Sequence, residues 1–186
     1  MLDWFERNLP FQRNFDFQVD VIKEITSLVG LRNFIVAPIT EEFIFRACIV
    51  STLYLGGFST LAIILISPLY FGIAHVHHGW EIYHTYGETS YALKQALFTM
   101  GFQFLYTSLF GWYATYSFMR TGLLLPVILQ HAFCNVMGFP DMSNVKRHPG
   151  WARIVIWTSL VLGAVGFTWT WFSLLNPKLF GGSLYW

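Results

Sequence analysis

The stretch ITEEFIFRA (residues 39–47) sets two carboxylates and a guanidinium inside one of the most apolar regions of the sequence. Residues four apart on a helix share one face, so Glu42 and Arg46 are expected to form an ion pair. Glu41 points about 100° away from Glu42 around the same helix. The spacing therefore predicts a structural pair, Glu42–Arg46, and a second carboxylate, Glu41, which faces a different neighbour and suits a catalytic role.

The sequence around this stretch has 186 residues, of which 55% are hydrophobic and 11% charged. Its mean hydropathy is +0.50. These values lie outside the usual range of soluble domains and predict a membrane protein. The formal net charge of +1 excludes the basic footprint of a nucleic-acid-binding protein. Cys48 and Cys134 both lie in apolar runs, which favours small buried thiols over a disulfide.

Several apolar stretches are each roughly long enough to cross ~30 Å of hydrocarbon as a helix. The sequence therefore predicts an all-α fold, a polytopic transmembrane bundle of about five spanning helices. Residues 1–31 form a mixed or amphipathic amino-terminal segment, and residues 32–186 form the transmembrane core. A polar, histidine-rich loop is expected from His77 to Lys94. The predicted spans cover residues 34–55, 58–76, 96–119, 122–140 and 152–175.

Lysine and arginine residues are divided unequally between the two sides of these spans. Eight lie on the side of the amino terminus, whereas two, Arg120 and Lys178, lie on the opposite side. Positively charged residues favour the cytosolic side of a membrane. The amino terminus is therefore expected in the cytosol.

Ionisable side chains inside a span cost about 2.5–3.5 kcal/mol each on insertion scales, so their presence indicates function. Beyond the first span, the candidates are His75 in the second span and His131 with Asn135 in the fourth. His131 and Asn135 are four apart and present an imidazole and a carboxamide on one helix face. With the amino terminus in the cytosol, Glu41 and these three residues all fall in the cytosolic half of the bilayer, where they can meet.

The same residues form three motifs: EExxxR (residues 41–46), FxxxH (71–75) and HxxxN (131–135). In this order, inside successive apolar spans, they resemble the type II CAAX prenyl endopeptidases. This family, also called Ras-converting enzymes, belongs to the intramembrane glutamate proteases. The resemblance covers about residues 31–186. Family members usually carry further transmembrane helices before the EExxxR helix, whereas only mixed residues precede it here, so the resemblance implies a chain that is short at its amino end.

The resemblance implies an endopeptidase that removes the last three residues of prenylated CaaX proteins such as Ras-like small GTPases. It assigns Glu41 and His75 to the activation of water, and His131 and Asn135 to the stabilisation of the oxyanion. It implies no metal or other cofactor. The implied location is the endoplasmic reticulum membrane, with the active site facing the cytosol. A substrate anchored in the bilayer by its prenyl chain would arrive at such a site.

Other functions are compatible with these residues. A zinc peptidase could use Glu41, His75 and His131 as ligands. However, the sequence contains no HExxH motif, and Asn135 would then have no evident role. The charges could instead serve packing or proton transfer in a non-enzymatic membrane scaffold.

Two further alternatives concern thiol and metal chemistry. Cys134 lies three residues from His131 and could act as a nucleophile, although an apolar setting favours the unreactive neutral thiol. A metal could also bind in the histidine-rich loop, where solvated histidines are the more common outcome. The candidate ligands there are His75, His77, His78 and His84.

Overall fold

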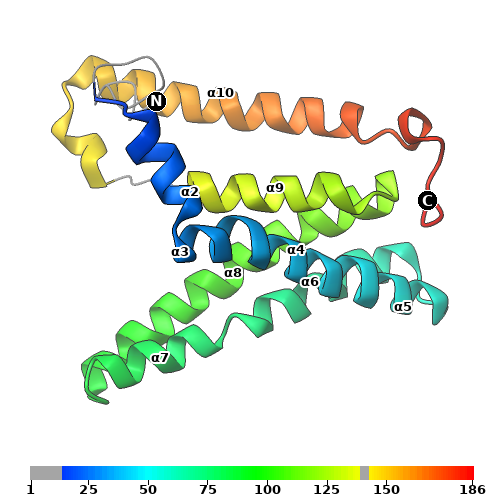
Figure 1. Cartoon of the computed structure of the whole chain (residues 1–186), viewed down its shortest axis with the longest axis horizontal. Helices are drawn as coiled ribbons and strands as arrows, with labels where there is room; N and C mark the ends of the chain where they lie inside the picture. The colour runs from blue at the N-terminus through cyan, green and yellow to red at the C-terminus, as the bar shows by residue number, and fades with distance from the viewer. Residues whose placement is uncertain (1–13, 139–142) are drawn as a thin grey trace. The chain divides into compact units, whose positions relative to one another are not determined.

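The structure is a computed structural model that describes residues 14–138 and 143–186. Within these residues every regular element is a helix, which confirms the predicted all-α fold (Figure 1). In chain order the elements are η1 (Phe17–Lys23), α2 (Glu24–Thr26), α3 (Leu28–Leu31), η2 (Arg32–Val36), α4 (Ala37–Glu42), η3 (Phe43–Val50), α5 (Ser51–Leu55), α6 (Thr60–Ala74), α7 (His77–Thr85), α8 (Ser90–Thr121), α9 (Leu124–Met137), η4 (Ser143–Arg147), α10 (Gly150–Leu174) and η5 (Pro177–Phe180).

The chain groups into two compact units. The first unit comprises Met1–Pro38 and His131–Asn176, and the second comprises Ile39–Gln130 and Pro177–Trp186. In the second unit, α6 packs along α8, α7 packs against α8, and η3 contacts both α6 and α8. The predicted amino-terminal segment, residues 1–31, is helical from Phe17 onward, while residues 1–13 lie outside the described residues. The boundary near residue 31 stays a prediction.

The first predicted span is a helical run from Arg32 to Leu55 that alternates between α and π geometry. From the end of α4 through η3, buried positions recur every four residues: Glu42, Arg46 and Val50 are 0%, 1% and 0% exposed. An α-helix has 3.6 residues per turn and a π turn has more, so a mixed run can sustain this longer period. One face of the run therefore carries both the charged pair and an apolar anchor.

A glycine allows α8 to approach α6 closely. A Cβ atom added at Gly111 would lie 2.8 Å from the Cβ atom of Pro68 and 3.2 Å from its Cα atom. Small residues at such contacts let the backbones of membrane helices come together. The hydroxyls of Ser67 and Thr115 add a hydrogen bond of 3.4 Å between the same two helices. The pairing of α6 with α8 thus combines backbone proximity with a polar contact.

Replacing Gly111 with alanine is expected to reduce the free energy of unfolding by about 1–3 kcal/mol, because the ring and backbone of Pro68 cannot move aside. Thermal unfolding of the purified protein in detergent measures this loss. Gly101→Ala on the same helix is the matched control, since nothing lies within 4 Å of a Cβ atom added there. That control is expected to match the wild type or to gain up to about 1 kcal/mol. Equal destabilisation by both substitutions would contradict the close contact at Gly111.

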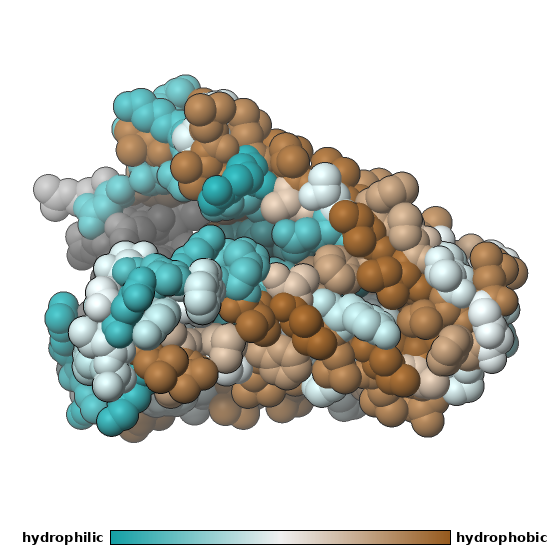
Figure 2. Space-filling view, turned by 90° about the horizontal axis from the view of Figure 1, so that it is seen from below, coloured by the Kyte–Doolittle hydropathy of each residue, from teal (hydrophilic) through white to brown (hydrophobic). Residues whose placement is uncertain are grey.

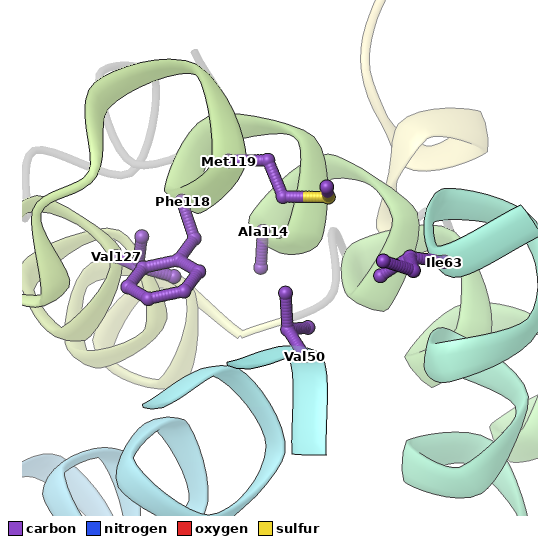
Figure 3. Packing of buried hydrophobic residues seen from close by; sticks show 6 residues of the cluster. All are labelled: Val50, Ile63, Ala114, Phe118, Met119 and Val127. Carbon is purple, nitrogen blue, oxygen red and sulfur yellow. The ribbon is translucent and has the colours of Figure 1, made fainter. Parts of the chain in front are cut away.

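The core of the second unit lies between the first helical run, α6, α8 and the start of α9. Its buried side chains converge in one cluster (Figure 3). The cluster comprises Val50, Ile63, Ala114, Phe118, Met119 and Val127.

The last residues of the chain pack against this core. Tyr185 joins the cluster, and its hydroxyl lies 2.8 Å from the hydroxyl of Ser51. Tyr54 donates a hydrogen bond of 2.7 Å to the carbonyl of Leu184, and Ser183 donates one to the carbonyl of Met119. The end of the first run and the end of α8 therefore lie at the same end of this unit, as the predicted alternation of spans requires.

The prediction of a loop from His77 to Lys94 is wrong, because α7 occupies His77–Thr85 and α8 begins at Ser90. Gly79 of α7 is buried, and a Cβ atom added there would lie 2.9 Å from the Cβ atom of Met100 in α8. A short helix that docks through a glycine leaves no apolar stripe in the sequence, so its polar composition resembled that of a loop. The second, fourth and fifth predicted spans agree with α6, α9 and α10 to within a few residues, and the third, residues 96–119, lies within the longer α8.

Large apolar side chains cover much of the surface (Figure 2). On α10, only Ala152 and Ile156 are buried, while Leu162 and Trp169 are 70% and 78% exposed. A surface of this kind is unfavourable in water and suits contact with lipid. By length and composition, two helical stretches among the described residues can cross a membrane, Thr60–Thr85 and Gly150–Leu174, and α9 is a shorter apolar helix.

Candidate active site

The buried charges of the second unit form the predicted ion pair. Arg46 Nη1 lies 2.9 Å from the carboxylate of Glu42 and donates a hydrogen bond to it, and both side chains are almost completely buried. The helical run brings them together because they are four residues apart. The predicted pair, Glu42–Arg46, is thus present in the structure.

Aromatic rings and a backbone carbonyl complete the surroundings of Arg46. Its guanidinium carbon lies 4.7 Å from the ring centroid of Phe71 on α6 and 5.7 Å from that of Phe110 on α8. Nη2 also donates a long hydrogen bond, 3.5 Å, to the carbonyl of Gly111. A desolvated guanidinium is stabilised by such rings. Arg46 therefore links the first helical run to both α6 and α8.

The second carboxylate, Glu41, faces the histidine that caps the carboxyl end of α6. Its Oε2 atom lies 3.9 Å from Nε2 of His75. The side chain of Glu41 is 30% exposed and that of His75 is 19% exposed, in contrast to the buried pair next to them. The structure thus brings together Glu41 and His75, which the sequence predicted to act together.

A backbone carbonyl fixes which nitrogen of His75 faces Glu41. Nδ1 lies 2.7 Å from the carbonyl oxygen of Phe71. Because a carbonyl oxygen only accepts, Nδ1 carries the hydrogen, and the neutral ring presents the lone pair of Nε2. The Phe71 ring also packs against the His75 ring at a centroid distance of 4.7 Å. Phe71 therefore contacts both Arg46 and His75.

The role of Phe71 in this arrangement was missing from the sequence prediction. Phe71 and His75 are four residues apart, so their positions on one helix face could have indicated the contact. The FxxxH motif thus describes a histidine together with the residue whose carbonyl orients it.

His131 and Asn135 lie on α9 within the first unit. His131 is 6% exposed. The Asn135 side-chain nitrogen donates a hydrogen bond of 2.8 Å to the carbonyl of Asn33, a contact between residues far apart in sequence that no local pattern indicated. Glu41 and His75 belong to the second unit, and each unit is described by itself. The approach of His131 and Asn135 to Glu41 and His75 therefore stays a prediction.

Both cysteines have free thiols. Cys134 is partly buried and Cys48 is exposed on the surface of the second unit. The expectation that both are buried is therefore wrong for Cys48, which lies at the wall of a pocket of about 340 Å³ lined by Ile49, Thr52, Leu53 and Tyr70. In a membrane, such an apolar wall can be covered by lipid.

An all-α architecture, apolar outer helix faces and a carboxylate–imidazole pair beside a buried ion pair define a helical membrane protein with a site suited to acid–base chemistry. Residues 24–137 match the family model described as type II CAAX prenyl endopeptidase Rce1-like. The chain belongs to this family, as the three motifs predicted.

Curated relatives agree with this family. The chain is 42% identical over 147 residues to a probable CAAX prenyl protease 2 of Schizosaccharomyces pombe, an overlap of 79% of this chain and 53% of the relative. It is 37% identical to CAAX prenyl protease 2 of Arabidopsis thaliana (88% of this chain, 50% of the relative). It is 36% identical to the Homo sapiens protein of the same name (84% and 46%). The chain thus spans about half the length of these relatives, and no solved structure matches it.

Proposed function

We propose that this chain carries the catalytic site of an intramembrane endopeptidase, which removes the last three residues of prenylated CaaX proteins. The observation that carries the proposal is the facing pair of Glu41 and His75, with Nδ1 of His75 engaged by the Phe71 carbonyl. The names of the relatives, all CAAX prenyl proteases, support the same reaction class.

The separation between the two acceptor atoms fits the activation of water. At 3.9 Å, Glu41 Oε2 and His75 Nε2 are too far apart for a direct hydrogen bond, but one water molecule can bridge them by donating to each. As the water oxygen attacks the carbonyl carbon of the prenylated cysteine, one of its protons passes to this pair. The pair then returns the proton to the leaving amine as the carbon–nitrogen bond breaks.

His131 and Asn135 are proposed to stabilise the oxyanion that forms during this attack. A protonated ring nitrogen and a carboxamide can both donate hydrogen bonds to a developing negative charge. The hydrogen bond from Asn135 to Asn33 limits the orientations of the carboxamide. Positioned donors of this kind require no reorganisation at the moment of reaction.

The substrates are proposed to be proteins with a prenylated CaaX end, among them Ras-like small GTPases. Each methylene of a prenyl chain contributes about 0.8 kcal/mol to membrane binding, so the bond to be cleaved is held at the bilayer. We place the enzyme in the endoplasmic reticulum membrane with its site toward the cytosol, on the basis of the lysine and arginine distribution and the family.

A cleavage assay on a farnesylated CaaX peptide tests this function. The purified chain, reconstituted in lipid, is expected to release the carboxy-terminal tripeptide, and an unprenylated peptide is the negative control. A parallel reaction after removal of metals by a strong chelator is expected to proceed at the same rate. Loss of cleavage on chelation with recovery on Zn²⁺ would favour the zinc peptidase with Glu41, His75 and His131 as ligands. No cleavage by well-folded protein would favour a membrane scaffold.

Substituting Cys134 with serine is expected to leave at least half of the cleavage rate, because the partly buried sulfur has a packing role in this proposal. Cleavage per inserted protein, compared with that of the wild type, measures the effect. Complete loss in a normally inserted protein would support a thiol nucleophile paired with His131.

A further inference from the structure

The first turn of α7 holds a second group of ionisable side chains, separate from the pair of Glu41 and His75. His77, His78 and Glu81 place one donor atom each within 4.8 Å of one another. All three belong to the second unit, and His77 is exposed. The proposed peptidase reaction uses none of them.

The orientation of His77 suits a metal ligand. Its Nδ1 atom lies 2.8 Å from the carbonyl oxygen of Ala74, at the end of α6. That carbonyl only accepts, so Nδ1 carries the hydrogen and Nε2 presents its lone pair outward. Histidine ligands of metals are commonly held in this way, with the second ring nitrogen donating to a carbonyl or carboxylate. The same contact brings the His77 ring to a centroid distance of 4.0 Å from the His78 ring.

The spacing of His78 and Glu81 also suits a metal. Nδ1 of His78 lies 3.3 Å from Oε2 of Glu81. Two ligands of a tetrahedral zinc ion with bonds of about 2.0–2.2 Å are separated by about 3.3–3.5 Å. The other exposed histidine–carboxylate pair of this region, His84 and Glu88, has a separation of 2.5 Å, which is a close hydrogen bond. Within the described residues, the pair of His78 and Glu81 belongs to a group of three possible metal ligands, whereas the pair of His84 and Glu88 does not.

We propose that His77, His78 and Glu81 form a binding site for a divalent transition metal, with Zn²⁺ as the best match. Two imidazoles and one carboxylate are a common zinc ligand set, and a water molecule can occupy the fourth position. The three donor atoms, all within 4.8 Å of one another, can converge on the ion by rotation of their side chains. All three ligands belong to the first turns of α7, so the bound ion stabilises the amino-terminal end of this helix, two residues after His75.

Metal binding to the full chain in lipid nanodiscs tests the site. Zn²⁺ is titrated in competition with a chromophoric chelator, and Co²⁺ is used as a probe because its visible absorption distinguishes tetrahedral from octahedral coordination. The wild type is expected to bind one equivalent of Zn²⁺ and to show a tetrahedral Co²⁺ spectrum. Glu81→Gln and, as a second variant, His78→Asn are each expected to weaken binding at least tenfold, since changes to the outer partners of ligands alone cost about 10–100-fold.

Matched variants distinguish this site from other histidines and carboxylates. His84→Asn removes an exposed histidine of the same helix outside the group and is expected to bind Zn²⁺ as the wild type does. Glu41→Gln is also expected to bind normally, which separates the site from a zinc peptidase centre. Unchanged binding by both Glu81→Gln and His78→Asn, an equal loss in His84→Asn, or loss in Glu41→Gln would overturn the proposal. Monodisperse protein and unchanged helical content are required of every variant.

Discussion

Replacing Glu41 with glutamine is expected to reduce cleavage of a farnesylated CaaX peptide by about 10²–10⁴-fold, while the protein accumulates in the membrane like the wild type. The substitution removes the carboxylate that faces Nε2 of His75 but leaves both partners of the buried pair, Glu42 and Arg46, unchanged. The Glu41 side chain is 30% exposed, so a neutral side chain of the same size fits there without burying a new charge. A glutamine cannot take a proton from water.

The measurement requires matched message levels, quantification of membrane-inserted protein and cleavage normalised to that quantity. Glu24→Gln, at a carboxylate in α2, is the control for a general effect of charge removal. Turnover by Glu41→Gln close to that of the wild type would remove Glu41 from the mechanism and with it the proposed role of its pairing with His75.

Glu42→Gln is expected to act in the opposite way, by lowering the amount of inserted protein at least as much as the activity per molecule. Glu42 and Arg46 are 0% and 1% exposed, so loss of the carboxylate leaves a guanidinium charged and buried. Breaking such a pair costs about 3–5 kcal/mol, a large part of the stability of an ordinary domain. The cost can be measured from abundance and from the unfolding midpoint of the purified variant.

A double variant separates the charge effect from other consequences of the substitution. Adding Arg46→Met to Glu42→Gln removes the charge left behind and is expected to restore part of the lost abundance, because apolar replacement of a whole buried pair is often tolerated. Recovery will be partial, since the contacts of Arg46 with the Phe71 and Phe110 rings are also lost. Normal accumulation of Glu42→Gln as an inactive protein would show that the two carboxylates have been assigned the wrong way round.

The elements of the fold that depend on local sequence were predictable. Apolar runs of sufficient length identified α6, α9 and α10, and a spacing of four identified the pair of Glu42 and Arg46. These predictions succeed because helical periodicity and hydrophobic length are properties of neighbouring residues. α7 was missed because its sequence is polar, although it packs on α8 with Gly79 close to Met100.

Contacts between distant segments could not be derived in the same way. The proximity of Glu41 to His75 was predicted from a family resemblance and from their similar depth in the predicted membrane. Helical geometry alone does not say which helices are neighbours. The hydrogen bond from Asn135 to Asn33 and the packing of Tyr185 against Ser51 join residues more than a hundred positions apart. Turn and cap signals describe only nearby residues and carry no information on such pairs.

The period of four in the first helical run makes the length of that run as important as its composition. In an α-helix, each step of four residues overshoots a full turn by about 40°, so two steps would separate Glu42 from Val50 by about 80° around the axis. The wider π turns between them cancel this drift, which keeps both residues buried. Loss of one residue from Phe43–Val50 with a return to α geometry would leave Glu42 and Val50 about 20° from alignment, whereas gain of one residue in α geometry would turn them about 180° apart. The segment is therefore expected to tolerate substitution on its exposed side, and to tolerate the loss of one residue better than the gain of one.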